Sequence, residues 1–368
     1  RIQKEALEAC QSAEELLGRG EVDAALAAVD RAYERMLELP ANGDDTYLQA
    51  KEDIRILAAD LIGRIHGAGR RAAAPTSTSW DLALPIVDNQ HVQREIQSFT
   101  SGEREQFLEG YRRSGLYRPL ILARLEKAGL PSQLSWLPLV ESWFKVRALS
   151  RASALGMWQF ISSTGVRYGL SRDSWVDERL DPEKSTDAAI AYLIDLHGLF
   201  GDWPKALAGY NCGEGCVARA VRENRAVGRP TDFWSLRLPT ETRAYVPKLL
   251  AISRLVASPE TYGLTFAPIP NQPYFGVVDA GKQVHLGEAA DLAGISRDDM
   301  FALNPAFNRM STPPHGPHRL LLPVERVEPF RAALASGVSP ERVASEPPPP
   351  PPDTRHQVRR GENLTGIS

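Results

Sequence analysis

The stretch Leu134-Ser135-Trp136-Leu137-Pro138-Leu139-Val140-Glu141-Ser142-Trp143-Phe144 places a carboxylate at the end of an apolar run. If residues 132–142 form one helix, then Leu134, Leu137 and Glu141 share a face, at positions i, i+3 and i+7. The face that buries two leucines would also carry a carboxyl group. Buried glutamate is uncommon unless it is paired or used, and burial raises a carboxyl pKa towards neutrality, as a general acid requires.

A structural interpretation of Glu141 competes with this catalytic one. A glutamate at a helix end can face solvent, or it can pair with Arg147 or Arg151 further along the chain. Residues 156–160 (Gly-Met-Trp-Gln-Phe) follow fifteen residues later, and together with two further motifs they favour the catalytic interpretation.

Length and composition fit a chain of two or three packed domains, because 43% of its 368 residues are hydrophobic. The net charge of −3 gives no reason to expect nucleic acid or an anionic membrane surface as a partner. No run approaches 18 consecutive apolar residues, so we expect no transmembrane helix. The sequence begins at Arg1 rather than Met, which leaves open an anchor or signal segment upstream.

The three cysteines do not form a disulfide framework, because their number is odd. Cys212 and Cys216 enclose only three residues and fit two small buried side chains, a local disulfide or part of a metal site. Zinc needs two further ligands, and the nearest histidine or cysteine in the sequence is His197. Small buried residues are the favoured interpretation, and the sequence predicts no cofactor or metal.

The N-terminal region, residues 1–75, reads as helical. Apolar spacing predicts an antiparallel hairpin of two helices, over about 2–17 and 22–39, and a third helix over about 46–66. The small and polar segment 67–79 suits a linker.

Residues 76–268 form a predicted all-α domain, since no alternating strand pattern appears between 80 and 260. Thr100 and Glu103 form a predicted capping box, Ser132 a predicted N-cap, and Pro138 is expected to bend the helix that carries Glu141. The expected helices cover about 100–113, 117–129, 132–142, 186–199, 203–210, 214–227 and 241–257.

A small α/β module is predicted over residues 269–330, in the order strand, helix, helix, strand. Residues 331–355 form a Pro-rich linker, whose run of prolines suits an extended tether. Residues 356–368 begin a further strand and helix and then stop.

Four blocks in order and spacing resemble the membrane-bound lytic murein transglycosylase D family. The resemblance implies a mainly α protein with a lysozyme-like catalytic domain over residues 76–268. The blocks are Glu141-Ser142, Ser150 through Phe160, Gly209-Tyr210-Asn211 (with Gly in place of the usual Ala) and Glu241 through Val246.

The C-terminal region resembles LysM modules, which bind the N-acetylglucosamine-containing glycans of peptidoglycan or chitin. Residues 273–324 look like a divergent complete copy, and 356–368 like the start of a truncated one. For the complete copy, a role as a structural spacer is the alternative to glycan binding.

Most glycosidases use two catalytic carboxylates, whereas in this sequence only Glu141 is clearly indicated as catalytic. The resemblance implies that Glu141 protonates the glycosidic oxygen between N-acetylmuramic acid and N-acetylglucosamine. The resulting carboxylate then takes the proton of the muramyl C6 hydroxyl, which closes a 1,6-anhydro ring without water.

The resemblance also implies roles for further residues. Ser150 would hydrogen-bond near Glu141 or the N-acetyl group, Gln159 would offer its amide to the glycan, and Tyr210 would bond to Glu141 or the sugar. The expected substrate-binding set is Ser150, Met157, Gln159, Tyr168, Tyr210, Asn211, Glu241 and Tyr245.

Several members of this set also fit a purely structural role. Met157 and Tyr168 fit a cleft wall or the core equally well, and Asn211 fits a turn. Glu241 fits either a second functional carboxylate or a helix N-terminus. Glu214, Asp177 and Asp181 are interpreted as solvent-facing or capping residues.

Two other functions compete with the transglycosylase: a muramidase in which Glu241 helps water, and an inactive scaffold that binds the cell wall. Intact Glu141, Ser150, Gln159 and Tyr210 argue against the scaffold. The expected partner is the peptidoglycan glycan strand, without nucleic acid. The expected location is the periplasm or cell envelope, with outer-membrane association through a segment absent from this sequence. The oligomeric state stays open.

Overall fold

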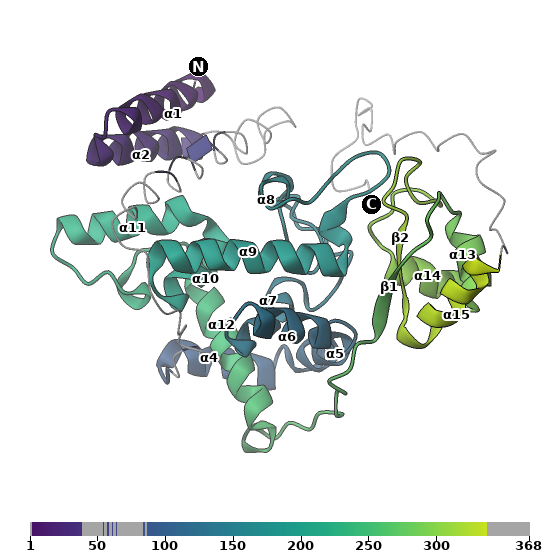
Figure 1. Cartoon of the computed structure of the whole chain (residues 1–368). Helices are drawn as coiled ribbons and strands as arrows, with labels where there is room; N and C mark the ends of the chain where they lie inside the picture. Colours follow the sequence, from purple (N-terminus) through teal and green to yellow (C-terminus); the bar gives the residue numbers. More distant parts are fainter. Residues whose placement is uncertain are drawn as a thin grey trace, which may run out of the picture. The chain divides into compact units, whose positions relative to one another are not determined.

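The computed structural model describes residues 2–38, 54, 57, 58, 61, 64, 84 and 87–336. Helices dominate these residues, and one two-stranded sheet accompanies them (Figure 1). The predicted mainly α fold is confirmed. The chain divides into two compact units, which are Arg1–Ser171 with Glu178–Tyr274 (unit 1) and Arg172–Asp177 with Phe275–Ser368 (unit 2). The predicted domain boundaries themselves stay a prediction.

The N-terminal hairpin consists of α1 (Ile2–Gly18) and α2 (Val22–Glu38), close to the predicted bounds. Small side chains let the two helices approach closely, and the buried alanines between them are Ala6, Ala13, Ala25, Ala28 and Ala32. Ile54, Ala58 and Leu61 join the same cluster. The rest of the predicted third helix, about 46–66, and the predicted linker 67–79 lie outside the described residues.

Unit 1 continues with α4 (Gln90–Thr100), α5 (Arg104–Ser114) and α6 (Arg118–Lys127). The predicted capping box is wrong, because Thr100 ends α4 and its hydroxyl donates to the Ile96 carbonyl at 2.8 Å. Asn89 caps α4 instead, accepting hydrogen bonds from two backbone N–H groups of the first turn.

Four helices form the body of unit 1: α9 (Pro182–Phe200), α10 (Trp203–Cys212), α11 (Glu214–Ala226) and α12 (Thr240–Ala257). Asp181 caps α9, as one of its two interpretations expected, and Asp202 caps α10. α10 packs against α9, α11 and α12, and α12 also packs against α4 (Figure 1). The shorter elements are α8 (Ser162–Arg167), η2 (Glu178–Leu180), η3 (Phe233–Ser235) and η4 (Pro259–Tyr262).

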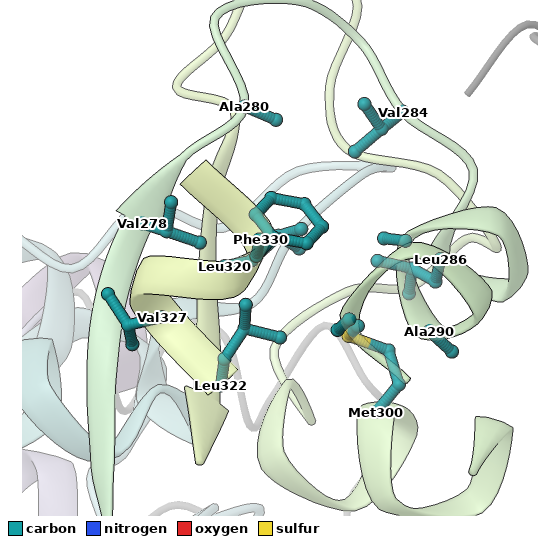
Figure 2. Close-up of a cluster of buried hydrophobic side chains, with 12 residues drawn as sticks. Val278, Ala280, Val284, Leu286, Ala290, Met300, Leu320, Leu322, Val327 and Phe330 are labelled. Carbon is teal, nitrogen blue, oxygen red and sulfur yellow. The ribbon is translucent and has the colours of Figure 1, made fainter. Parts of the chain in front are cut away.

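Unit 2 pairs β1 (Phe275–Asp279) with β2 (Arg319–Pro323) in antiparallel register. Between them in sequence lie α13 (Leu286–Ala293) and α14 (Arg297–Leu303), so the predicted strand–helix–helix–strand order is confirmed. Figure 2 shows side chains from β1, β2, α13, α14 and the helix that follows β2, all directed into one apolar cluster.

A further helix of unit 2, α15 (Val324–Ala335), was missed by the sequence reading. Its Phe330 is fully buried in the same cluster (Figure 2), so the predicted linker cannot begin at residue 331. The rest of that linker, from 337, and the module start at 356–368 lie outside the described residues.

The segment Arg172–Asp177 belongs to unit 2 by its contacts. The Asp177 amide donates to the Ala306 carbonyl and the Asn308 amide to the Trp175 carbonyl, each at 2.8 Å. Asp177 is buried, so its interpretation as solvent-facing is wrong. Among the described residues, no helix has the length and apolarity needed to cross a membrane.

Candidate active site

The segment that carries Glu141 is two short helices rather than one. A 3₁₀ turn, η1 (Ser132–Trp136), leads directly into α7 (Leu137–Ser142). Pro138 lies in the first turn of α7, where its missing N–H has no helical partner to lose, so it starts a helix instead of bending one. The predicted Ser132 cap is also absent, since no side-chain bond caps η1. The result leaves Leu137 and Leu139 fully buried and Glu141 partly exposed.

Two aromatic residues end α7 directly after Glu141 and Ser142. Trp143 and Phe144 both adopt the left-handed conformation, with φ of 55° and 56°, which is strained for bulky side chains. Their surroundings hold them there: Phe144 is buried, and the Arg113 Nε donates to the Trp143 carbonyl at 2.8 Å. The abrupt end fixes the last turn, and with it the direction of Glu141.

Tyr245 of α12 donates a hydrogen bond from its hydroxyl to Glu141 Oε1 at 2.5 Å. The pKa of Glu141 is raised from 4.5 to about 8, because burial, the largest cause, and the charge of Glu241 raise it more than the Tyr245 hydrogen bond lowers it. Near pH 7 the carboxyl is therefore mostly protonated. Such a group can donate a proton and, once ionised, is held by the tyrosine.

Tyr210 occupies a different position from the one predicted. Its hydroxyl donates to the Trp158 carbonyl at 3.0 Å, so the expected bond to Glu141 is wrong in this structure and Tyr245 makes that bond instead. Burial raises the pKa of the partly buried Tyr210 phenol, and the charge of the nearby Glu141 raises it further. A direct bond from Tyr210 to the sugar stays a prediction.

The block from Ser150 to Phe160 folds into a loop stabilised by its own polar side chains. The Ser150 hydroxyl accepts from the Ala154 amide at 3.0 Å, and the Gln159 amide nitrogen donates to the carbonyls of Ala148 (3.1 Å) and Gly156 (2.7 Å). Both side chains thus shape the loop, and no bond joins either to Glu141. Their contacts with substrate stay predictions.

Met157 and Trp158 lie in the core, with side chains 1% and 0% exposed. The Trp158 indole donates to the Thr186 hydroxyl at 3.0 Å, which fixes the ring on α9. The Met157 carbonyl lies 2.9 Å from the hydroxyl of Ser142 and accepts its hydrogen bond. The core alternative fits Met157 better than a cleft wall. Met157 joins this loop to the Glu141 helix, and Trp158 joins it to α9.

The remaining predicted residues lie on α10, α12 and the end of α8. Asn211 accepts a bond from the Thr242 hydroxyl at 2.7 Å, which ties α10 to α12. Glu241 is exposed in the first turn of α12, four residues before Tyr245. Tyr168 is partly buried, and its hydroxyl donates to Asp195 at 2.9 Å. Contact of these residues with substrate stays a prediction.

Sequence reasoning missed the residues that position Glu141. Arg113 and Thr186 belong to no motif, and no pattern in the sequence indicates the left-handed conformation of Trp143. The sequence alone does not indicate their roles, because each acts through a contact with a residue at least 28 positions away. The described residues contain no group of three histidine, cysteine or acidic side chains arranged to hold a metal ion.

Two regions of the chain match models of known protein families. Residues 119–233 match the Transglycosylase SLT domain family, and residues 274–339 match the LysM-like domain of the lytic transglycosylase MltD. Membrane-bound lytic murein transglycosylase D of Escherichia coli strain K12 is 33% identical over 307 residues, which cover 80% of this chain and 67% of that protein. A putative tributyltin chloride resistance protein of Alteromonas sp. strain M-1 is 31% identical over 163 residues, covering 44% of this chain and 77% of that protein.

Proposed function

The chain belongs to the membrane-bound lytic murein transglycosylase D family and is a peptidoglycan lytic transglycosylase, and we propose that Glu141 is its single acid and base. One observation carries the assignment: a carboxyl group with a pKa of about 8 lies on a rigidly ended helix and is bonded to Tyr245. Among the residues matched by the transglycosylase domain, this is the group prepared to give and then take a proton at neutral pH.

In the proposed reaction, Glu141 donates its proton to the oxygen between N-acetylmuramic acid and N-acetylglucosamine. Tyr245 occupies Oε1, so Oε2 is the oxygen that carries the proton. As the glycosidic bond breaks, positive charge develops on the muramyl ring and Glu141 becomes a carboxylate. The carboxylate then removes the proton from the C6 hydroxyl, whose oxygen bonds to C1 of the same ring.

The nucleophile belongs to the substrate, so no second carboxylate has to activate water. Well-oriented intramolecular groups react with effective molarities of roughly 10⁵ M or more. Glu241 is exposed and raises the pKa of Glu141 by its charge, which supports a role in keeping Glu141 protonated. A muramidase, by contrast, would need Glu241 or another carboxylate to deliver water.

The substrate locates the protein. Peptidoglycan lies in the bacterial cell envelope, so we assign the chain to the periplasmic side of the envelope. The Escherichia coli relative is described as membrane-bound, which supports association with a membrane through a segment beyond this sequence. For unit 2, the match to a LysM-like domain supports binding of the glycan strand.

Digestion of purified peptidoglycan tests the proposal. We expect the wild-type chain to release muropeptides one water lighter than reducing-end muropeptides, as measured by mass spectrometry. Glu141→Gln should release none, while Glu241→Gln should retain the same anhydro products. Products that carry the added water would make the protein a hydrolase, and unchanged activity in Glu141→Gln would overturn the assignment of the acid.

A further inference from the structure

Unit 1 contains a buried carboxylate, Glu214, that the proposed reaction does not use. Glu214, the first residue of α11, is 6% exposed, so its interpretation as a solvent-facing residue is wrong. It does not cap the helix either, since Gly213 occupies that position. Burying a charge is costly unless the charge is paired and hydrogen-bonded. A carboxylate kept here therefore needs partners and a purpose.

Two partners hold the Glu214 carboxylate from two other helices. The Arg167 guanidinium on α8 lies 2.7 Å from Oε1, and the Tyr192 hydroxyl on α9 donates to Oε2 at 3.1 Å. The cation and the hydroxyl thus satisfy both oxygens. The carboxylate joins the start of α11 to the end of α8 and the middle of α9.

One of these groups, Tyr192, also contacts the segment that carries Tyr210. The Tyr192 hydroxyl also lies 3.3 Å from the Gly209 carbonyl, and its ring centroid is 5.2 Å from that of Tyr210. Arg167 lies on the helix that follows the loop containing Trp158, whose carbonyl accepts the bond from Tyr210. Glu214 therefore ties together the two segments that meet at the Tyr210 hydroxyl.

A disulfide fixes the turn in which Glu214 lies. Cys212 and Cys216 are bonded, with a Cα–Cα distance of 5.9 Å, and they enclose Gly213 and Glu214. The favoured interpretation of the two cysteines as small, unbonded residues is therefore wrong. Gly213 has a φ of 88°, which other residues rarely adopt, and this conformation breaks the chain between α10 and α11. The bond links the end of α10 to the first turn of α11, where Glu214 lies.

We propose that Glu214 is a positioning residue of the active site: clamped by Arg167 and Tyr192 and enclosed by the disulfide, it holds Tyr210 beside Glu141 and keeps water away from the acid. The proposal rests on the proposed role of Glu141. The groups that face Glu141 are Tyr245 and Glu241 on α12 and Tyr210 on α10. Loosening Tyr210 admits water to Glu141, which weakens the desolvation that raises its pKa.

The alkaline limb of the kcat profile against pH reports this change directly. Glu214→Gln retains the shape of the side chain, and its amide oxygen can still accept the hydrogen bond from Tyr192. The substitution removes the negative charge that pairs with Arg167. We expect kcat to fall about tenfold, with little change in KM, because a small displacement near the reacting atoms acts mainly on the chemical step. We also expect the limb to move to lower pH by about one unit.

Three comparisons separate a positioning role from a general loss of stability. Glu223→Gln changes an exposed carboxylate on the same helix and should leave kcat and the limb unchanged. Arg167→Met should reproduce the shift, whereas Arg167→Lys, which keeps the charge, should restore most of it. Reduction of the disulfide, or Cys212→Ser with Cys216→Ser, should move the limb in the same direction by a smaller amount.

The outcome depends on the limb rather than on stability alone. A lower melting temperature with an unshifted limb in Glu214→Gln and Arg167→Met would show a merely structural role and overturn the proposal. If Glu214→Gln fails to fold, the pH profiles of Arg167→Met and Arg167→Lys test the same proposal. Wild-type activity and the dead Glu141→Gln variant in the same assay test the proposed function separately, so the two failures are distinguishable.

Discussion

Two glutamates of unit 1, the partly buried Glu141 and the buried Glu214, have opposite kinds of partner. Glu141 ends α7 beside the hydroxyl of Tyr245, and in the part of the chain that the structure describes no arginine or lysine pairs with it. Glu214 begins α11 with Arg167 at 2.7 Å. The first carboxyl has its pKa raised to about 8. The second carries the cation that burial of a carboxylate demands.

The difference shows that burial alone does not decide whether a carboxyl group is charged. A nearby cation compensates the loss of hydration, whereas a hydroxyl compensates only part of it. The Glu141 carboxyl therefore carries a proton near pH 7, whereas Glu214 forms an ion pair with Arg167. One arrangement suits proton transfer, and the other suits holding helices together.

The largest effect should separate the two glutamates by turnover. Glu141→Gln removes the only proposed proton donor, so the initial rate of muropeptide release should fall about 10³-fold. Glu214→Gln should cost only about tenfold, because it acts through Tyr210. Equal losses in the two variants, measured at one pH on the same peptidoglycan, would remove the distinction between acid and support.

The next effect concerns the pH dependence of stability. The pKa of Glu141 in the folded protein, about 8, lies above its ordinary value of 4.5, so between these values the folded chain keeps a proton that the unfolded chain loses. The stability from this proton is complete below pH 4.5 and is lost as the pH rises through 8. Glu141→Gln removes the titration, so the variant should gain about 3 kcal/mol relative to wild type between pH 5 and pH 8.

Urea unfolding at several pH values measures this difference. Glu223→Gln, on an exposed carboxylate, provides the control and should show no relative change with pH. Parallel curves for wild type and Glu141→Gln would mean that Glu141 is ionised throughout this range, and would contradict its raised pKa.

Removing the cation beside Glu214 should make the second segment resemble the first. Arg167→Met leaves a buried carboxylate unpaired, so the free energy of unfolding should fall by about 2 kcal/mol at pH 7. This value lies below the range for a fully buried pair, because the Arg167 side chain is 31% exposed. Adding Glu214→Gln should recover part of the loss. A double variant as unstable as the sum of the single ones would show that the two residues do not interact.

The smallest expected effect sharpens the role of Tyr245. Its hydrogen bond lowers the pKa of Glu141, so Tyr245→Phe should raise that pKa and move the alkaline limb of kcat to higher pH. The rate should fall about tenfold, since the carboxylate formed during the reaction loses its donor. The shift is opposite in sign to the one expected for Glu214→Gln, and a shift to lower pH would contradict the orientation described.

The sequence predicted the helices that carry the site because their apolar spacing is regular. It also identified Glu141, since a carboxylate at the end of an apolar run is chemically unusual. The local geometry escaped prediction where a proline or a missed helix changed the assignment. Pro138 suits the start of α7 as well as a bend, and Thr100 looked like a cap because α4, which it ends, had not been predicted.

The partners within the site could not be read from the sequence. Tyr210 and Tyr245 are equally plausible donors to Glu141, and only the packing of α12 shows that Tyr245 reaches it across 104 positions. Glu214 looked like a surface residue because helix starts often carry acidic side chains. Its burial follows from Arg167, which comes 47 positions earlier.

The glycine at position 110 of α5 sets a limit on engineering this protein for heat resistance. Alanine is the better helix former by roughly 0.5–1 kcal/mol, so Gly110 invites replacement on propensity grounds. A Cβ atom there, however, would lie 2.5 Å from the Leu139 side chain and 3.3 Å from the Trp143 ring. Both neighbours belong to the segment that aims Glu141. Overpacking of this kind costs about 1–3 kcal/mol, which exceeds the gain in helix propensity. Gly110→Ala should therefore lower thermal resistance and turnover together.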